Sequence, residues 1–132
     1  MDLNKRCFQE IRLVDGQGSR NESIFSGRVE VRQPNGTWGT VCAWSGFDSN
    51  DASVICKMFD FEFGVPRSSY YFGEGVGDIY MDFLRCTGDE RSVFTCPYFG
   101  WGSHFSWCDH SNDAGVICSK TPVSTLIIVI LY

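Results

Sequence analysis

The sequence predicts an α+β domain that is stabilised by disulfide bonds and contains one main helix. Three observations support this prediction. Six cysteines are spread over residues 42–118, an Asn-Gly pair between two alternating runs predicts a β-hairpin, and a single segment has helical periodicity. Because that segment does not alternate regularly with strands, the order of elements favours an α+β module over repeated β-α-β units.

Strands and a hairpin are predicted in the N-terminal part of the chain. Ile11–Val14 alternates in hydropathy and then meets Asp15-Gly16, which indicates a first strand that ends in a turn. Arg28–Arg32 also alternates, and Asn35-Gly36 separates it from the run Thr37–Cys42. Asn-Gly at this position is a strong signal for a tight hairpin turn.

One helix is predicted over about residues 50–60. Polar residues 48–51 offer N-cap side chains immediately before it. Gly64 and Pro66 exclude continuation of the helix beyond the low 60s. Apolar residues recur along one face at a spacing of three to four: Ala52, Ile55, Cys56 and Phe59.

The C-terminal half is predicted to contain a loop and two strands. Residues 64–78 include four glycines, which predicts a long loop. Ile79–Leu84 and Ala114–Cys118 have the composition of strands.

Composition places the chain in an oxidising compartment. Seven cysteines in 132 residues are expected to pair rather than stay reduced. Sequons at Asn21 and Asn35 predict N-glycosylation and agree with passage through the secretory pathway. The net charge of −5 and the scattered basic residues give no general attraction for nucleic acid or anionic membranes.

The chain divides into a leader or linker (1–10), a domain (11–119) and an apolar tail (120–132). The N-terminal residues lack the apolar core of a signal peptide, which favours a module cut from a longer protein. Leu126–Leu131 is continuously apolar but shorter than the ~20 residues of a membrane helix. Two interpretations fit this tail: a final buried strand or an exposed artefact of gene prediction, and the start of a truncated transmembrane segment that would anchor the protein.

Eight sequence blocks occur in order and cover roughly residues 11–119. They are Ile11–Gly16, Gly27–Val31, Trp38–Cys42, Asn50–Ala52, Phe72–Gly75, Arg85-Cys86, Gly100–Gly102 and Asp113–Cys118. Together with the cysteine spacing, these blocks resemble the scavenger receptor cysteine-rich (SRCR) domain. The resemblance implies a curved, antiparallel-rich sheet that cradles the main helix.

Six cysteines allow 15 pairings, and their spacing alone does not choose among them. The resemblance implies Cys42–Cys108, Cys56–Cys118 and Cys86–Cys96. The family positions of an additional bridge fall near Phe25 and Phe63, which implies the six-cysteine, group A type. Cys7 lies outside this scheme. It is an unpaired thiol, the partner of an upstream residue, or the source of an intermolecular disulfide.

By resemblance the chain is a non-catalytic recognition module of an extracellular membrane or secreted protein. The implied partners are proteins or polyanionic surfaces, such as microbial glycans or modified lipoproteins. The alternative is an accessory domain of a larger extracellular enzyme, either an oxidase or a serine protease. The residues themselves show no Gly-x-Ser-x-Gly elbow and no motif around either histidine that would support catalysis.

Family members can bind Ca²⁺ or Mg²⁺ through loop carboxylates, so the same site is a hypothesis for this chain. The family places two acids after the first paired cysteine, where this chain has Ala43 and Trp44. Asn112 stands where a third acid is expected. The remaining candidate ligands are therefore Asp48, Asp51, Asp82, Asn112 and Asp113. Asp48 and Asp51 are equally explained as residues that cap or flank a helix N-terminus.

The altered loop favours contact with a protein over cation-assisted capture of a polyanion. Ala43, Trp44 and Phe47 are the predicted contact residues. Aromatic residues also crowd the segment between Cys86 and Cys108. Most of them are expected in the core, and a minority in the 98–107 loop is expected at the surface.

Overall fold

The computed structural model describes residues 9–44 and 46–122 as six strands, two α-helices and short 3-10 helices. The strands are β1 Glu10–Val14, β2 Ile24–Arg32, β3 Gly39–Val41, β4 Phe63–Ser68, β5 Ile79–Met81 and β6 Ala114–Ser119. The helices are α1 Ser49–Lys57 and α2 Ser69–Phe72, with the 3-10 helices η2 Val93–Thr95 and η3 His110–Asn112.

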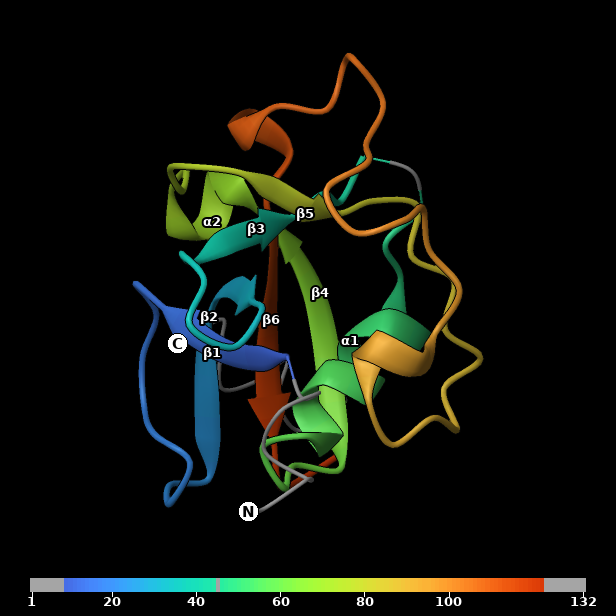
Figure 1. Ribbon diagram of the computed structural model, residues 1–132. Coiled ribbons are helices and arrows are strands. Elements are labelled where there is room, and N and C mark those ends of the chain that lie inside the picture. Colours follow the sequence, from blue (N-terminus) through green and yellow to red (C-terminus); the bar gives the residue numbers. More distant parts are fainter. Residues whose placement is uncertain (1–8, 45, 123–132) are drawn as a thin grey trace.

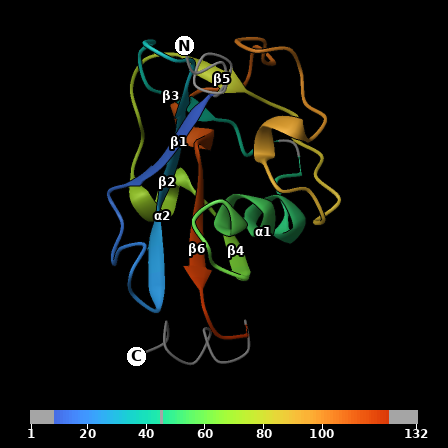
Figure 2. The same cartoon turned by 60° about the horizontal axis from the view of Figure 1, so that its bottom comes forward.

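The strands form one curled mixed sheet, and α1 is the main helix (Figure 1). The strand order is β4-β6-β2-β3-β5, with β1 paired to β2 off this path. All pairs are antiparallel except β3 with β5. Helix α1 lies beside β4 and β6, as a second view shows (Figure 2). The α+β fold with one main helix is confirmed.

The hairpin predicted around Asn-Gly is present. Strand β2 pairs with β3 through Glu30 with Thr40 and Val31 with Gly39. Asn35 has a φ of 64°, a left-handed conformation that asparagine tolerates better than most residues. The N–H of Gly36 closes the turn by donating to the carbonyl of Gln33 at 2.8 Å.

Helix α1 begins with a capping box. The carboxylate of Asp48 accepts hydrogen bonds from the N–H groups of Asn50 (3.0 Å) and Asp51 (3.1 Å). The carboxylate of Asp51 in turn accepts from the N–H of Asp48 at 2.9 Å. These bonds satisfy backbone donors that a helix N-terminus otherwise leaves without partners. The buried face of the helix then packs on the sheet through Ala52, Val54, Ile55 and Cys56.

Strand β6 joins the helix to the sheet. It is buried along its whole length and pairs with β2 on one side and β4 on the other. Cys118 in β6 forms a disulfide with Cys56 in α1, with the Cα atoms 5.3 Å apart. The other bridges are Cys42–Cys108 and Cys86–Cys96, so the pairing is the one that the resemblance implies.

The prediction of one long loop over residues 64–78 is wrong for its first part, which forms β4 and α2. Pro66 lies inside β4 opposite Val116. A proline is tolerated there because β4 is an edge strand in the path, and its outer side needs no N–H donor. The predicted strand 79–84 is shorter than expected. It ends at Met81, since Phe83 has a φ of 60°, which breaks the extended backbone.

Two predictions concern residues outside the described ranges. Cys7 lies in one of these segments and Leu126–Leu131 in the other. Among residues 9–44 and 46–122, no helix has the length and apolar character required to cross a membrane.

We expect Asp48→Ala to lower the free energy of unfolding by about 1 kcal/mol, because two N–H groups of α1 lose their acceptor. Chemical denaturation of the disulfide-intact protein would measure this change. Ser49→Ala is the matched control, since it alters the adjacent exposed residue without touching the capping box. Equal stability of the two variants would contradict the capping role.

Candidate recognition site

The loop that follows β3 and the segment that precedes η3 form one end of the molecule. The Cys42–Cys108 disulfide joins them, and Figure 1 shows the two segments side by side. The N–H of Ala43 donates to the carbonyl of Asn112 at 2.6 Å. The side-chain amide of Asn112 donates to the carbonyl of Trp107 at 3.4 Å. Segments whose bridged cysteines are 66 positions apart in sequence are thereby held together.

Two tryptophans are exposed beside this disulfide. Trp44 has 57% of its surface exposed and Trp107 has 51%. Trp44 follows Cys42 by two residues, and Trp107 immediately precedes Cys108. Exposed tryptophans are candidate contact residues, because tryptophan is enriched among the residues that dominate protein–protein binding energy. The sequence predicted Trp44 individually, whereas Trp107 was only one of several aromatics in a crowded segment.

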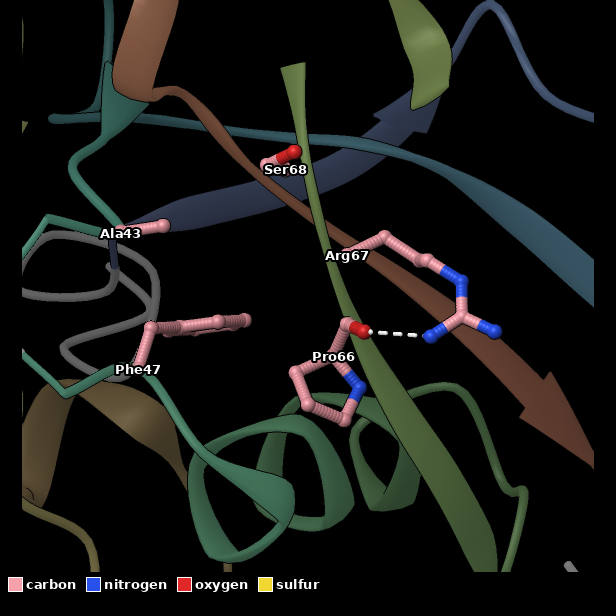
Figure 3. A pocket seen from close by; sticks show the side chains of 5 residues that line it. All are labelled: Ala43, Phe47, Pro66, Arg67 and Ser68. Carbon is pink, nitrogen blue, oxygen red and sulfur yellow. Dashed lines mark hydrogen bonds between the residues drawn. The ribbon is translucent and has the colours of Figure 1, made fainter. Parts of the chain in front are cut away.

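An open pocket of about 220 Å³ lies next to this loop (Figure 3). Phe47 and Pro66 face each other across it, and Ala43 and Ser68 also point toward it. Arg67 lines it by its backbone, because its guanidinium extends to the other side of β4 and donates to the carbonyl of Pro66 at 2.9 Å. The walls are therefore mainly apolar. This pocket therefore suits an apolar side chain better than a cation.

The first two candidate cation ligands have structural roles. Asp48 caps α1 as described above. Asp51 is buried, and its second carboxylate oxygen accepts from the N–H of Cys86 at 2.8 Å. Burial raises the pKa of Asp51 to about 6, against the lowering effect of its hydrogen bonds to the backbone of Asp48 and Cys86. The carboxylate of Asp51 therefore links α1 to the segment that follows β5.

Asp82 and Asp113 are fully buried and accept hydrogen bonds from backbone N–H groups. Asp82 accepts from Phe83 at 2.7 Å and from Phe105 at 2.9 Å. Asp113 accepts from Gly75 at 2.7 Å. Buried carboxylates need such partners because desolvation of an unpaired charge is costly. These bonds hold the loops around the site in place.

No three of the four candidate aspartates lie together as one group of potential metal ligands. Within the described ranges, two groups of three potential metal ligands occur, Cys42–Asp82–Cys108 and Cys86–Glu90–Cys96. Each contains both sulfurs of a disulfide, which cannot act as thiolate ligands. Of the five candidates, Asp82 alone belongs to such a group. The side-chain amide of Asn112 donates to the carbonyl of Trp107, as described above.

His110 connects Asp113 to the loop before β5. Its Nδ1 lies 3.0 Å from a carboxylate oxygen of Asp113, and its Nε2 lies 2.8 Å from the carbonyl of Gly77. Burial lowers the pKa of His110, but the hydrogen bonds to Gly77 and Asp113 and the nearby negative charges outweigh this effect and raise it. The protonated imidazole can donate to both acceptors at once.

Most arginines of the sheet are already paired with acids. Glu30 is buried and accepts from Arg12 (2.9 Å) and from Arg28 (3.0 Å). Three further ion pairs are Arg28–Asp15, Arg32–Glu10 and Arg20–Asp60. Because these cations are neutralised by carboxylates, this part of the surface has little positive charge left for a polyanion.

Comparison with known proteins identifies the family. The family model of the scavenger receptor cysteine-rich domain matches residues 18–119. The chain belongs to the SRCR family. An SRCR domain superfamily protein from Patiria pectinifera is 42% identical over 111 residues, which are 83% of this chain and 9% of that protein. The chain thus spans about a tenth of that relative's length.

Two solved SRCR domains have the same fold. The third SRCR domain of murine neurotrypsin is 41% identical, with a TM-score of 0.71 over 87% of this chain and 99% of that domain. The dimeric form of the SRCR domain of mouse MARCO is also 41% identical, with a TM-score of 0.66 over 74% of this chain and 90% of that one.

We expect His110 to stabilise the fold more at acidic than at alkaline pH. Its pKa is raised in the folded state, so its contribution is fully present below the unfolded value and is lost as the pH rises through the folded value. The difference in unfolding free energy between wild type and His110→Gln should be larger at about pH 5.5 than at about pH 8.5.

His104→Gln is the control for this comparison, because His104 bonds to a backbone carbonyl rather than to a carboxylate. Chemical denaturation at both pH values measures the two differences. If the difference in unfolding free energy between wild type and His110→Gln grew with pH, Asp113 and Gly77 would not stabilise the protonated imidazole as we infer.

Proposed function

We propose that this chain is a non-catalytic extracellular module that recognises proteins through the loop Ala43–Phe47. The observation that carries the proposal is the pair of exposed tryptophans, Trp44 and Trp107, on either side of one disulfide. Tryptophan is enriched among residues that dominate protein–protein binding energy. The adjacent apolar pocket offers a place for a partner's side chain.

Three further observations support an extracellular protein of this kind. Three disulfides cross-link the domain, which is typical of proteins in oxidising compartments. Both sequon asparagines, Asn21 and Asn35, are exposed and accessible to glycosylation. The family positions of an additional bridge fall near Phe25 and Phe63, and neither residue is a cysteine, so we infer the six-cysteine, group A type.

A second candidate function is that of an accessory domain in a larger extracellular enzyme. The similarity to a domain of neurotrypsin favours it. Both candidates assign recognition rather than catalysis to this domain. They differ in what the rest of the protein does.

We expect Trp44→Ala to weaken binding to a protein ligand about fivefold or more, because truncation of a dominant contact residue costs more than about 1 kcal/mol. The test is a binding screen of the disulfide-intact chain against an array of purified extracellular proteins, with dextran sulfate as a polyanion. Tyr70→Ala is the control, since Tyr70 is 99% exposed and lies in α2 rather than in the loop. Binding to dextran sulfate alone, unchanged by Trp44→Ala, would refute the proposal.

We expect no saturable heat when calcium is titrated into the protein. The candidate carboxylates already accept backbone N–H groups, and the loop lacks the acidic pair that the family uses. Isothermal calorimetry of wild type and Asp48→Ala provides the measurement. If calcium bound stoichiometrically and Asp48→Ala abolished the binding, the result would support a cation site and favour polyanion capture.

A further inference from the structure

The two N-glycosylation sequons differ in what surrounds their hydroxyl groups. A sequon is recognised by the amide of its asparagine and by the hydroxyl of the residue two positions later. In Asn21-Glu22-Ser23 all three residues are exposed. Within residues 9–44 and 46–122, the side chains of Asn21 and Ser23 have no hydrogen-bond or ion-pair partner. Both groups that a glycosyltransferase must reach are therefore open in the folded domain.

The hydroxyl of the second sequon, Asn35-Gly36-Thr37, is held by a residue of β5. The phenol of Tyr80 donates to the backbone carbonyl of Thr37 at 3.0 Å. The hydroxyl oxygen of Thr37 lies 3.0 Å from the same phenol oxygen. A phenol has only one proton, and Tyr80 gives it to the carbonyl. The hydroxyl of Thr37 must therefore be the donor in the second bond, so its own proton is already used.

Tyr80 is fixed by its neighbours in the fold. Strand β5, which contains it, pairs with β3 (Figure 1). Its ring stacks on Trp101, with centroids 4.7 Å apart and planes 14° from parallel, and its carbonyl accepts from the N–H of Gly102 at 2.8 Å. Gly39 also lies against it, because a Cβ atom there would be 2.5 Å from the ring. The contact with Thr37 thus forms only when β5 has joined the sheet.

The backbone of the second sequon is fixed as well. Asn35 has a φ of 64°, and the N–H of Gly36 donates to the carbonyl of Gln33 at 2.8 Å, so the sequon forms the turn of the β2–β3 hairpin. The side chain of Asn35 is exposed, and a glycan that is already attached to it is compatible with the fold. Exposure of the asparagine is not sufficient for transfer, however, because the hydroxyl of Thr37 is engaged.

We propose that Asn35 accepts an N-glycan only before Tyr80 docks on Thr37, whereas Asn21 remains an acceptor in the folded domain. This property is independent of the proposed recognition function. The co-substrate is a lipid diphosphate that carries an oligosaccharide. The amide nitrogen of Asn35 forms a bond to the anomeric carbon while the bond from that carbon to the diphosphate oxygen breaks. The amide loses one proton, and the lipid diphosphate leaves with the bonding electron pair.

The order of synthesis leaves a short interval for this transfer. Thr37 precedes Tyr80 by 43 positions. At about 5–20 residues per second, translation of that stretch takes roughly 2 to 9 s. Once Tyr80 and Trp101 have been made, glycosylation of Asn35 competes with closure of the sheet. The occupancy of Asn35 therefore depends on the rate of folding, and that of Asn21 does not.

The test compares two forms of the full chain, both produced without glycans: the folded, disulfide-intact protein and the reduced, alkylated, unfolded chain. Each is incubated with purified oligosaccharyltransferase and a lipid-linked oligosaccharide. Trypsin cleaves after Arg28 and Arg32, so mass spectrometry detects the two asparagines on separate peptides. We expect the unfolded chain to be modified at both sites. In the folded chain we expect Asn21 to be modified and the modification of Asn35 to fall about tenfold or more, since two hydrogen bonds must break first.

Tyr80→Phe keeps the ring that stacks on Trp101 and removes only the hydroxyl. In the folded form of this variant we expect modification of Asn35 to rise about fivefold over wild type, with Asn21 unchanged. Tyr70→Phe is the matched control, because it removes a phenol hydroxyl from an exposed residue of α2. Circular dichroism and thermal unfolding check that both variants fold.

Equal modification of Asn35 in the folded and unfolded chains would overturn the proposal. A folded chain that is modified at neither site would also overturn it, because folding in general, rather than Tyr80, would then block transfer. If Asn35 were modified as little in Tyr80→Phe as in wild type, the hairpin turn and not the contact would be the cause, which again contradicts the proposal. None of these results concerns the recognition loop, which Trp44→Ala tests separately.

Discussion

The double pairing of β6 is the constraint on which the rest of the structure depends. This strand is wholly buried, and hydrogen bonds tie it to β2 and β4 while Cys118 ties it to α1. Gly115 shows how tightly it is enclosed, because a Cβ there would lie 2.4 Å from the ring of Phe72. Asp113, just before the strand, pairs with Cys42. The position of β6 therefore sets where the recognition loop and the segment of Trp107 can meet.

Buried aspartates fasten the loops that the sheet itself does not reach. Asp51 connects α1 to Cys86, Asp82 connects the end of β5 to Phe105, and Asp113 connects β6 to Gly75. Each carboxylate replaces its lost hydration with N–H donors, the arrangement that makes a buried acid tolerable. The cost of burial remains visible at Asp51, whose pKa rises to about 6. Acids that the sequence offered as cation ligands thus serve as internal cross-links between loops.

The predictable part of this molecule is the part encoded by local chemistry. Asn35-Gly36 specifies a hairpin and Asp48 a helix start, and both were found where the sequence placed them. The sequence did not predict strand β4, because its partner β6 lies far along the chain. Pro66 also favoured a loop over a strand at this position. The exposure of Trp107 could not be predicted either, because it depends on the tertiary structure around the ring. Nothing in its neighbours distinguishes a ring that faces solvent from one that joins the core.

The distribution of charge and aromatic area favours the protein contact that we propose over capture of a polyanion. Capture of a polyanion requires cations that are free to meet it, yet Arg12 and Arg28 are already paired with Glu30 and Asp15. The exposed rings of Trp44 and Trp107 instead offer apolar area, whose burial depends little on ionic strength. Binding at this end should therefore depend on shape and apolar contact, with charge selecting the orientation of the partner. Ala43 and Trp44 lie in a loop outside the strands, so the residues that we propose for contact can differ in type while the pairing of β6 stays the same.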